Sequence, residues 1–128
     1  MQKQEFAKRT LHFGLRVIRL VESLPNSQTA RVIGNQLLRA GTAVGANYRS
    51  ALRGKSRADF VAKMGIVEEE CDEALYWMQM MIEAGIMKKS RLTKLMQEAN
   101  EIIAIVVSSI KTARARTSSP KSGFRNPK

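Results

Sequence analysis

The sequence predicts an all-α protein that folds as an up-down-up-down antiparallel four-helix bundle. Hydrophobic residues recur at helical spacing in four successive stretches, and no alternating β-strand pattern competes with them. Only 3 of the 128 residues are proline, so the four stretches are uninterrupted. Connections of a few residues favour antiparallel neighbours. The helices are predicted over about residues 3–24, 29–53, 57–84 and 90–115.

The boundaries of the first two helices are marked by residues that stop or cap helices. Pro25 stops the first helix because proline cannot donate a backbone hydrogen bond. Either Asn26 or Ser27 can cap the second helix through its side-chain oxygen. Gly54 then ends the second helix.

The third and fourth helices have similar signals. Ser56 and Asp59 lie three residues apart at the start of the third helix, close to a capping box with Asp in place of Glu or Gln. Gly85 ends that helix, and Ser90 lies near the start of the fourth. The four helices make one domain over residues 1–116.

The end of the chain has a different composition. From Thr117 the sequence TSSPKSGFRNPK loses the helical period and gains Ser, Pro and Gly. We therefore expect residues 117–128 to form a disordered basic tail.

Composition places the chain among soluble globular proteins. Hydrophobic residues make up 44% and charged residues 26%. The charged start lacks the apolar run of a secretory signal, and the longest apolar run, residues 102–107, is far shorter than the roughly 18 residues that span a membrane. The lone Cys71 cannot form an internal disulfide. We therefore expect a cytoplasmic protein without a membrane partner.

The charge is strongly positive and unevenly distributed. The net charge is +11, yet residues 58–87 contain seven acids and one lysine. The other segments are basic, and such an excess attracts polyanions. In the alternative interpretation, the acidic segment pairs with arginines of a neighbouring helix, and these salt bridges reduce the positive charge that is available to a polyanion.

The second helix and the turn after it contain six basic residues and no acid between positions 31 and 57. On a helical projection the arginines gather opposite the predicted buried face, where they can contact a ligand without disturbing the core. Side chains of this kind neutralise phosphates. The candidate nucleic-acid-binding residues are Arg39, Arg49, Arg53, Lys55 and Arg57.

Two further patterns exceed what a monomeric bundle needs. Three hydrophobic residues of the first helix lie nearly opposite its core face, and three glycines of the second helix form one line. Because glycine destabilises a helix, the line indicates that another backbone approaches closely, either a neighbouring helix of the same bundle or another subunit. The candidate oligomer interface comprises Leu11, Leu15, Ile18, Gly34, Leu38, Gly41 and Gly45.

Asn47 lies on the hydrophobic face of the second helix. A buried amide needs hydrogen-bond partners, and one use of such a residue is to fix helix register. We therefore expect Asn47 to be a structural residue that is hydrogen-bonded to another helix.

Motifs that would indicate catalysis fail on inspection. Gly54, Lys55 and Ser56 match the end of a P-loop, but Arg49 stands where that motif needs glycine, and a helix precedes the loop. A carboxylate-bridged metal site would need more than the single histidine, His12. We predict no catalytic, cofactor-binding or metal-binding residue, no small-molecule substrate and no enzymatic activity.

Three runs of sequence resemble a known family. They are GNQLLRAGTAVGANYR at 34–49, RADF at 57–60 and IVEEECDEALYW at 66–77. They resemble the bacterial four-helix-bundle family encoded in intervening sequences of large-subunit ribosomal RNA genes. The resemblance spans roughly residues 6–114 and implies an up-down bundle that assembles into rings of five. It also implies a distant relation to the accessory protein of diversity-generating retroelements, a basic pentamer that binds a reverse transcriptase and nucleic acid.

The chain departs from the family pattern at three positions. Ala43 stands where serine is frequent, and Ser50 and Ala51 replace an acidic residue and a glycine. These changes affect any function tied to those positions and leave the implied fold and assembly unchanged.

The leading hypothesis is therefore a non-enzymatic, oligomeric binding module that engages RNA or DNA phosphates, alone or with a protein partner. The competing hypothesis is a scaffold that binds only protein, in which the arginines form salt bridges to Glu69, Glu70 and Glu73.

Overall fold

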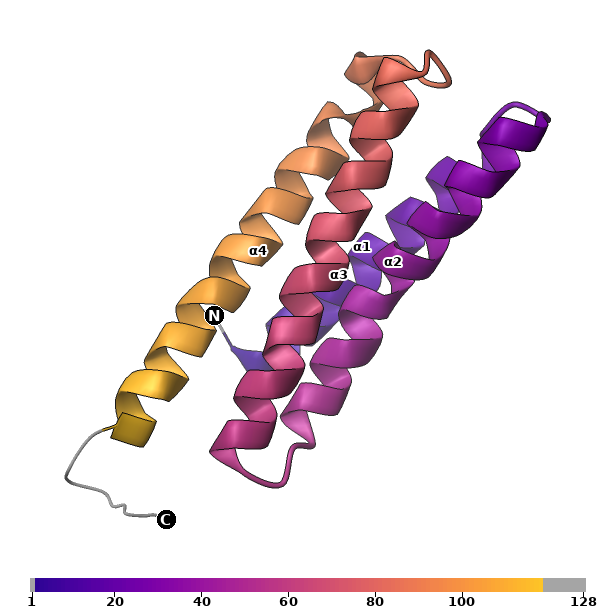
Figure 1. The fold of residues 1–128 in the computed structure, drawn as a ribbon. Coiled ribbons are helices and arrows are strands. Elements are labelled where there is room, and N and C mark those ends of the chain that lie inside the picture. Colours follow the sequence, from indigo (N-terminus) through magenta and orange to yellow (C-terminus); the bar gives the residue numbers. More distant parts are fainter. Residues whose placement is uncertain (1, 119–128) are drawn as a thin grey trace.

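The computed structural model describes residues 2–118, which form four α-helices and no β-strand (Figure 1). The all-α prediction is confirmed. The helices are α1 (Lys3–Glu22), α2 (Gln28–Leu52), α3 (Arg57–Glu83) and α4 (Lys89–Ser118).

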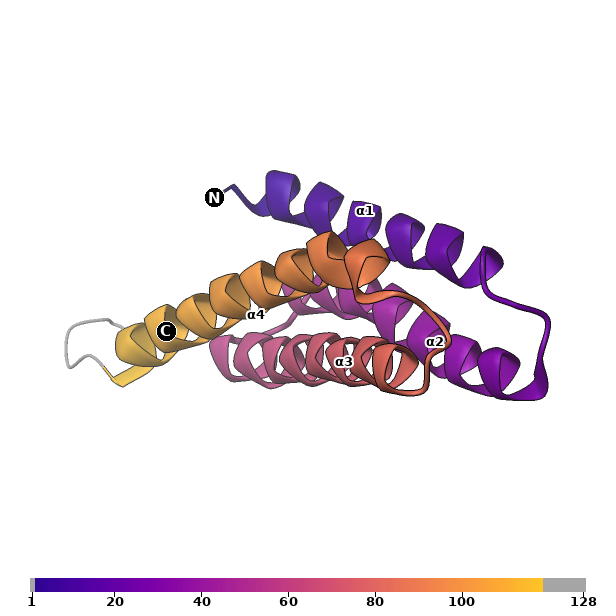
Figure 2. The same cartoon turned by 90° about the horizontal axis from the view of Figure 1, so that it is seen from above.

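The helices run up, down, up and down, and each packs mainly on its neighbours in the sequence. α1 packs on α2, α2 on α3 and α3 on α4, whereas α1 and α4 touch over a small area. Figure 2 shows α1 and α3 on opposite sides of α2, and α4 runs away from α1 toward its own C-terminal end. This arrangement is the predicted antiparallel four-helix bundle.

Ion pairs join α1 to α4 where their packing is sparse. Arg9 donates to Glu98 through Nε and Nη2 at 2.7 and 2.8 Å, and to Glu101 at 2.6 Å. The Arg9 hydrogen bond holds the pKa of Glu98 below its ordinary value, because it favours the charged carboxylate. These contacts make a polar clamp between the first and last helices.

Local sequence explains where the helices begin and end. The Ser27 hydroxyl accepts a hydrogen bond from the Ala30 amide at 3.2 Å, and the Ser56 hydroxyl accepts one from the Asp59 amide at 3.0 Å. These bonds satisfy amides that have no partner within the helix. After α3, Gly85 adopts φ = 72°, a left-handed conformation that glycine tolerates without strain.

The core fills the space between the four hydrophobic faces. Burying each large side chain contributes roughly 1.5–3 kcal/mol, so this core is the main source of stability. The largest fully buried hydrophobic side chains are Phe13, Val17, Leu37, Val44, Met64, Val67, Met78, Met81, Leu92, Ile102 and Val106.

The structure corrects the predicted start of the C-terminal tail. α4 continues through Ser118, so Thr117 and Ser118 are helical and do not begin a tail. The rest of the predicted tail, residues 119–128, lies outside the described residues. Between residues 2 and 118, no helix is long and apolar enough to cross a membrane.

Candidate functional site

The glycines of α2 bring α1 close to it. A Cβ at Gly41 would lie 2.7 Å from a methyl carbon of Val17, and one at Gly34 would lie 2.8 Å from Leu24. A Cβ at Gly45 would meet the backbone of Thr10 at 3.3 Å. The glycine line therefore serves packing within the chain. This corrects the placement of Gly34 and Gly41, both buried here, in an oligomer interface.

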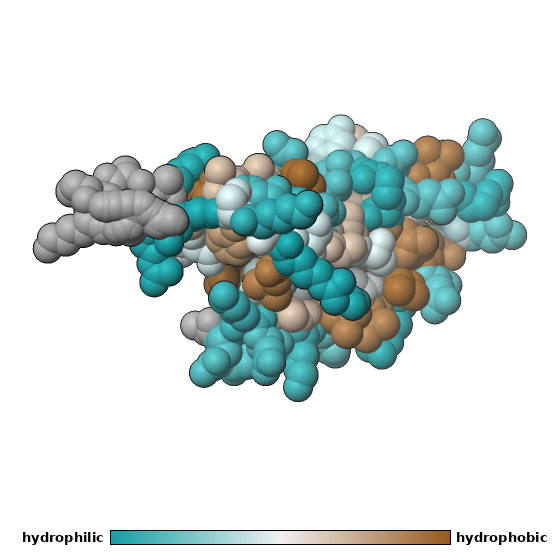
Figure 3. All heavy atoms as spheres, turned by 90° about the horizontal axis from the view of Figure 1, so that it is seen from below, coloured by the Kyte–Doolittle hydropathy of each residue, from teal (hydrophilic) through white to brown (hydrophobic). Residues whose placement is uncertain are grey.

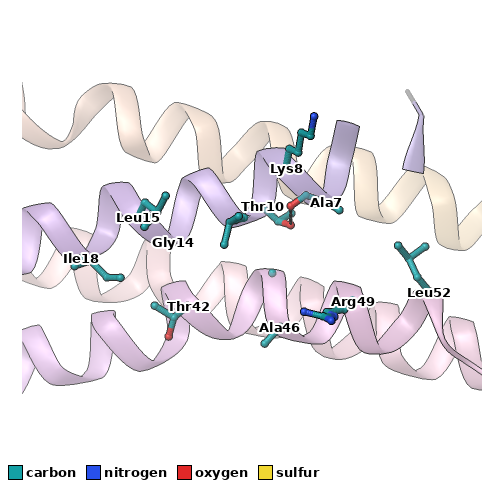
Figure 4. Close-up of a pocket in the computed structure, with 12 residues that line it drawn as sticks. Ala7, Lys8, Thr10, Gly14, Leu15, Ile18, Thr42, Ala46, Arg49 and Leu52 are labelled. Carbon is teal, nitrogen blue, oxygen red and sulfur yellow. Dashed lines mark hydrogen bonds between the residues drawn. The ribbon is translucent and has the colours of Figure 1, made fainter. Parts of the chain in front are cut away.

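Beside this close contact, an open groove runs between α1 and α2 (Figure 4). Its volume is about 530 Å³, and most of its lining is apolar. Figure 3 shows that hydrophobic side chains reach the molecular surface in patches among hydrophilic ones. The groove is lined by Ala7, Lys8, Thr10, Leu11, Gly14, Leu15, Ile18, Thr42, Gly45, Ala46, Arg49 and Leu52.

The three hydrophobic residues predicted on the outer side of α1 all line this groove. Leu11 is 64% exposed and Leu15 is 39% exposed, while Ile18 is half-buried. Lys8 of α1 and Arg49 of α2 add positive charge to the lining (Figure 4). Leu38, placed in the same predicted interface, is half-buried and lies outside the groove lining.

Arg39 has a different environment from the other candidate nucleic-acid-binding residues. Its guanidinium donates to Glu70 at 3.1 Å and also to Glu73, both on α3. The Trp77 indole donates to Glu73 at 3.0 Å. The hydrogen bonds from Trp77 and Arg39 lower the pKa of Glu73. Arg39 therefore links α2 to the acidic segment through two of the three glutamates that the alternative interpretation named, whereas Glu69 forms no salt bridge within residues 2–118.

The remaining candidate residues lie at one end of the bundle. Arg49 and Arg53 are exposed near the end of α2, and Lys55 and Arg57 are exposed in the following turn and at the start of α3. Nearby, the Asp59 carboxylate accepts from the Lys63 ammonium and the Lys55 amide, each at 3.1 Å. These bonds, that of Lys63 first, lower the pKa of Asp59.

The last turns of α4 add basic residues to the same end. Because the helices alternate in direction, the end of α4 lies at the same end of the bundle as the turn between α2 and α3 (Figure 1). The predicted helix over residues 90–115 already includes Lys111 and Arg114, and the longer α4 of the structure adds Arg116. We call the whole set the basic end: Arg49, Arg53, Lys55, Arg57, Lys111, Arg114 and Arg116, all exposed.

Asn47 differs from its prediction. Its side-chain amide donates to the Ala43 carbonyl at 2.8 Å, within α2, and the residue is half-buried. The predicted hydrogen bond to another helix is therefore wrong. An amide side chain can reach the carbonyl one turn earlier in its own helix, so the Asn47 amide group finds a partner without a second helix.

The Cys71 thiol is a buried core group. It donates to the Ala99 carbonyl at 3.3 Å, and burial raises its pKa to about 12. Such a thiol is almost wholly protonated at neutral pH and is a poor nucleophile. Among residues 2–118, no group of three or more His, Cys, Asp or Glu side chains is arranged to hold a metal ion.

Comparison with known proteins identifies the family. A family model described as 23S rRNA-intervening sequence protein matches residues 2–108. A solved structure from Bacteroides thetaiotaomicron, described as a protein with unknown function from the S23 ribosomal protein family, is 32% identical with a TM-score of 0.81. That match covers 87% of this chain and 99% of the other. A comparison with curated proteins finds no match. The chain therefore belongs to the family of 23S rRNA-intervening sequence proteins.

Proposed function

We propose that this protein is a non-enzymatic, oligomeric bundle that binds nucleic-acid phosphates through the basic end. The observation that supports this proposal most strongly is that α2 and α4 end, and α3 begins, at the same end of the bundle, where each helix contributes exposed Lys or Arg side chains. By the family resemblance, the partners are other copies of the chain, in a ring of five, together with RNA or DNA in the cytoplasm. The relation to the accessory protein of diversity-generating retroelements stays a prediction.

The electrostatics of the basic end favour a polyanion. Each exposed Lys or Arg that contacts a phosphate releases a condensed counterion, which gives binding a steep dependence on salt. Such contacts carry no sequence information, so we expect similar affinity for unrelated sequences. In an oligomer the basic end is repeated, and weak contacts then add through avidity.

A second explanation for these charges is structural. Arg53 caps the end of α2, and Arg116 lies in the last turn of α4. Basic side chains at such positions stabilise a helix by about 0.3–1 kcal/mol through its dipole. If the charges of the basic end only stabilise the helices, reversing them should lower the stability of the protein. If they form a binding surface, reversing them should lower the affinity for nucleic acid at nearly constant stability.

The test is a salt titration of RNA and DNA binding by fluorescence anisotropy. The variant carries Arg53→Glu, Lys55→Glu, Lys111→Glu and Arg116→Glu, and it leaves out Arg49 because that residue also lines the groove. The matched control carries Arg19→Glu, Lys88→Glu, Lys89→Glu and Lys94→Glu, which are exposed residues near the other end of the bundle. Both variants have the same net charge.

We expect the wild type and the control to bind with a steep salt dependence. The variant should lose affinity, and its slope of log K against log salt should become shallower by about 0.7–0.9 for each lost phosphate contact. Equal loss in variant and control would show that net charge alone attracts nucleic acid and would contradict a site at the basic end.

A protein-only scaffold is the second candidate function, and one specific observation favours it. The guanidinium of Arg39 is already bound to Glu70 and Glu73, so one of the five candidate nucleic-acid-binding residues is paired with α3 inside the chain. A wild-type protein that binds neither RNA nor DNA at low salt would support this scaffold and exclude the proposed binding module.

A further inference from the structure

We infer that the groove between α1 and α2 binds the outward side of α3 from a second copy, so that copies join head to tail. The inference rests on the self-association part of the proposed function and names the two surfaces that meet. We call the outward side of α3 the acidic face; its residues are Ala62, Gly65, Ile66, Glu69, Asp72 and Tyr76.

The groove needs an occupant with both apolar and acidic side chains. Leu11 and Leu15 expose hydrophobic surface there, and such a strip on a soluble protein marks an interaction site. Lys8 and Arg49 line the groove together with apolar and small uncharged residues, and no acidic residue is among the lining. Neither of these two side chains forms a salt bridge within residues 2–118.

The acidic face has that chemistry. Ile66 and Tyr76 are 42% and 54% exposed, and Glu69 and Asp72 are exposed between them. In the described part of the chain, neither carboxylate forms a salt bridge. The face is therefore an apolar helix surface with two uncompensated negative charges on a protein that is otherwise strongly basic.

Gly65 indicates where another copy approaches closely. A Cβ at this position would meet no atom within 4 Å, so nothing inside the chain requires glycine here. Glycine in a helix interior is destabilising compared with alanine. At the α1–α2 contact, in contrast, a Cβ added to any of the glycines would lie within 4 Å of an atom of the neighbouring helix.

The spacing along the two surfaces also agrees. Leu15 follows Lys8 by seven residues, and Tyr76 follows Glu69 by seven residues. Both intervals correspond to about 10 Å along a helix axis. A copy of α3 lying along the groove can therefore place a carboxylate beside Lys8 and its tyrosine ring near Leu15. Helices commonly bind apolar grooves in this way.

The pairing of two different surfaces has a geometric consequence. Each copy presents one groove and one acidic face, so the interface is heterologous. Such an interface generates a closed ring or an open filament, whereas a symmetric dimer would need one surface that pairs with itself.

The test uses charge reversal and sedimentation velocity on the full chain. The groove variant carries Lys8→Glu and Arg49→Glu, the face variant carries Glu69→Lys and Asp72→Lys, and a combined variant carries all four. A control with Lys89→Glu and Lys94→Glu changes exposed residues outside both surfaces. Circular dichroism verifies that each variant is helical.

We expect the wild type and the control to sediment as multiples of the 14.3 kDa chain, and the groove and face variants as monomers. The combined variant should assemble again because its charges oppose one another with exchanged signs. A 1:1 mixture of the groove and face variants should also associate, since the acidic face of the first can bind the basic groove of the second.

Three results would overturn the inference. The first is a monomeric wild type, and the second is a face variant that assembles as the wild type does. The third is a pair of results: the combined variant is helical but stays monomeric, and the 1:1 mixture of the groove and face variants does not associate. Salt-dependent RNA binding by the monomeric face variant is measured separately, because that variant retains the whole basic end. Failure of the interface is thus distinguished from failure of nucleic-acid binding.

Discussion

At the scale of single residues, the charged side chains divide into those that join helices and those that face solvent. Arg9 and Arg39 each bridge two helices through a pair of glutamates. Arg49 and Arg53 are exposed and form no salt bridge within residues 2–118. The sequence left open whether the arginines of the second helix bind a ligand or pair with the acidic segment. It could not show which arginine lies opposite which acid, since that depends on how the helices are rotated.

Glu98 should make stability depend on pH. Its pKa is lowered in the folded protein, so the Arg9 pair stabilises the fold above the ordinary glutamate pKa of 4.5. This stabilisation is lost as the pH falls through the lowered pKa. We expect Glu98→Gln to destabilise the protein by about 1–2 kcal/mol at pH 7, the scale of a hydrogen bond between charged groups.

The measurement is urea unfolding of wild type and Glu98→Gln at pH values from 7 down to 3. The difference between the two unfolding free energies should shrink steadily below pH 4.5. A difference that is independent of pH would show that the Arg9 ion pair does not provide the stability.

At the scale of elements, the sequence predicted the four helices well because their signals are local. The helical periodicity and the residues that start or stop helices affect only the backbone within a turn or two of their own positions. Those residues are Pro25, Ser27, Ser56 and Gly85. The glycine line on α2 was equally visible, but its partner was not. A line of glycines is expected whether α2 contacts α1 or another subunit, so the sequence cannot distinguish the two contacts. The packing of Gly41 on Val17 shows that the contact is with α1.

Two glycine-to-alanine substitutions should have opposite effects on stability. Gly65→Ala places a methyl group in open space and should stabilise the chain by about 1 kcal/mol through helix propensity. Gly41→Ala gains the same propensity but forces its Cβ against Val17, whose branched side chain has little freedom to move. Such overpacking typically costs about 1–3 kcal/mol, so Gly41→Ala should be destabilising or at best neutral.

Thermal unfolding monitored by circular dichroism compares the two variants with the wild type, at protein concentrations low enough to keep the chain monomeric. A stabilising effect of Gly41→Ala equal to that of Gly65→Ala would mean that α1 moves freely away from α2. The close contact between the helices would then contribute little to stability.

At the scale of the whole molecule, the sequence predicted the charge of each segment but not where all of these charges lie on the surface of the folded protein. The acidic segment and the three basic segments are evident from the sequence. The predicted fourth helix included Lys111 and Arg114 but not Arg116, because the periodicity weakens there into a run of Ala, Arg, Thr and Ser. The groove likewise requires the helices to be assembled, because its lining comes from two of them.

Leu15→Glu tests self-association without reversing any existing charge. The residue is partly exposed in the groove and lies outside the core, so we expect a change of less than about 1 kcal/mol in unfolding free energy. A carboxylate buried at an apolar interface would be costly, so the variant should sediment as a monomer at tens of micromolar. Retention of the wild-type mass by this variant would place the interface elsewhere.

The burial of Cys71 has a practical consequence for counting the copies in an assembly. It is the single cysteine of the chain, and its protonated, enclosed thiol should react slowly with maleimides at neutral pH. A second cysteine at an exposed position such as Ser90, far from the basic end, would therefore accept one dye per chain without removal of the native thiol. The number of photobleaching steps in single assemblies would then report the number of chains directly.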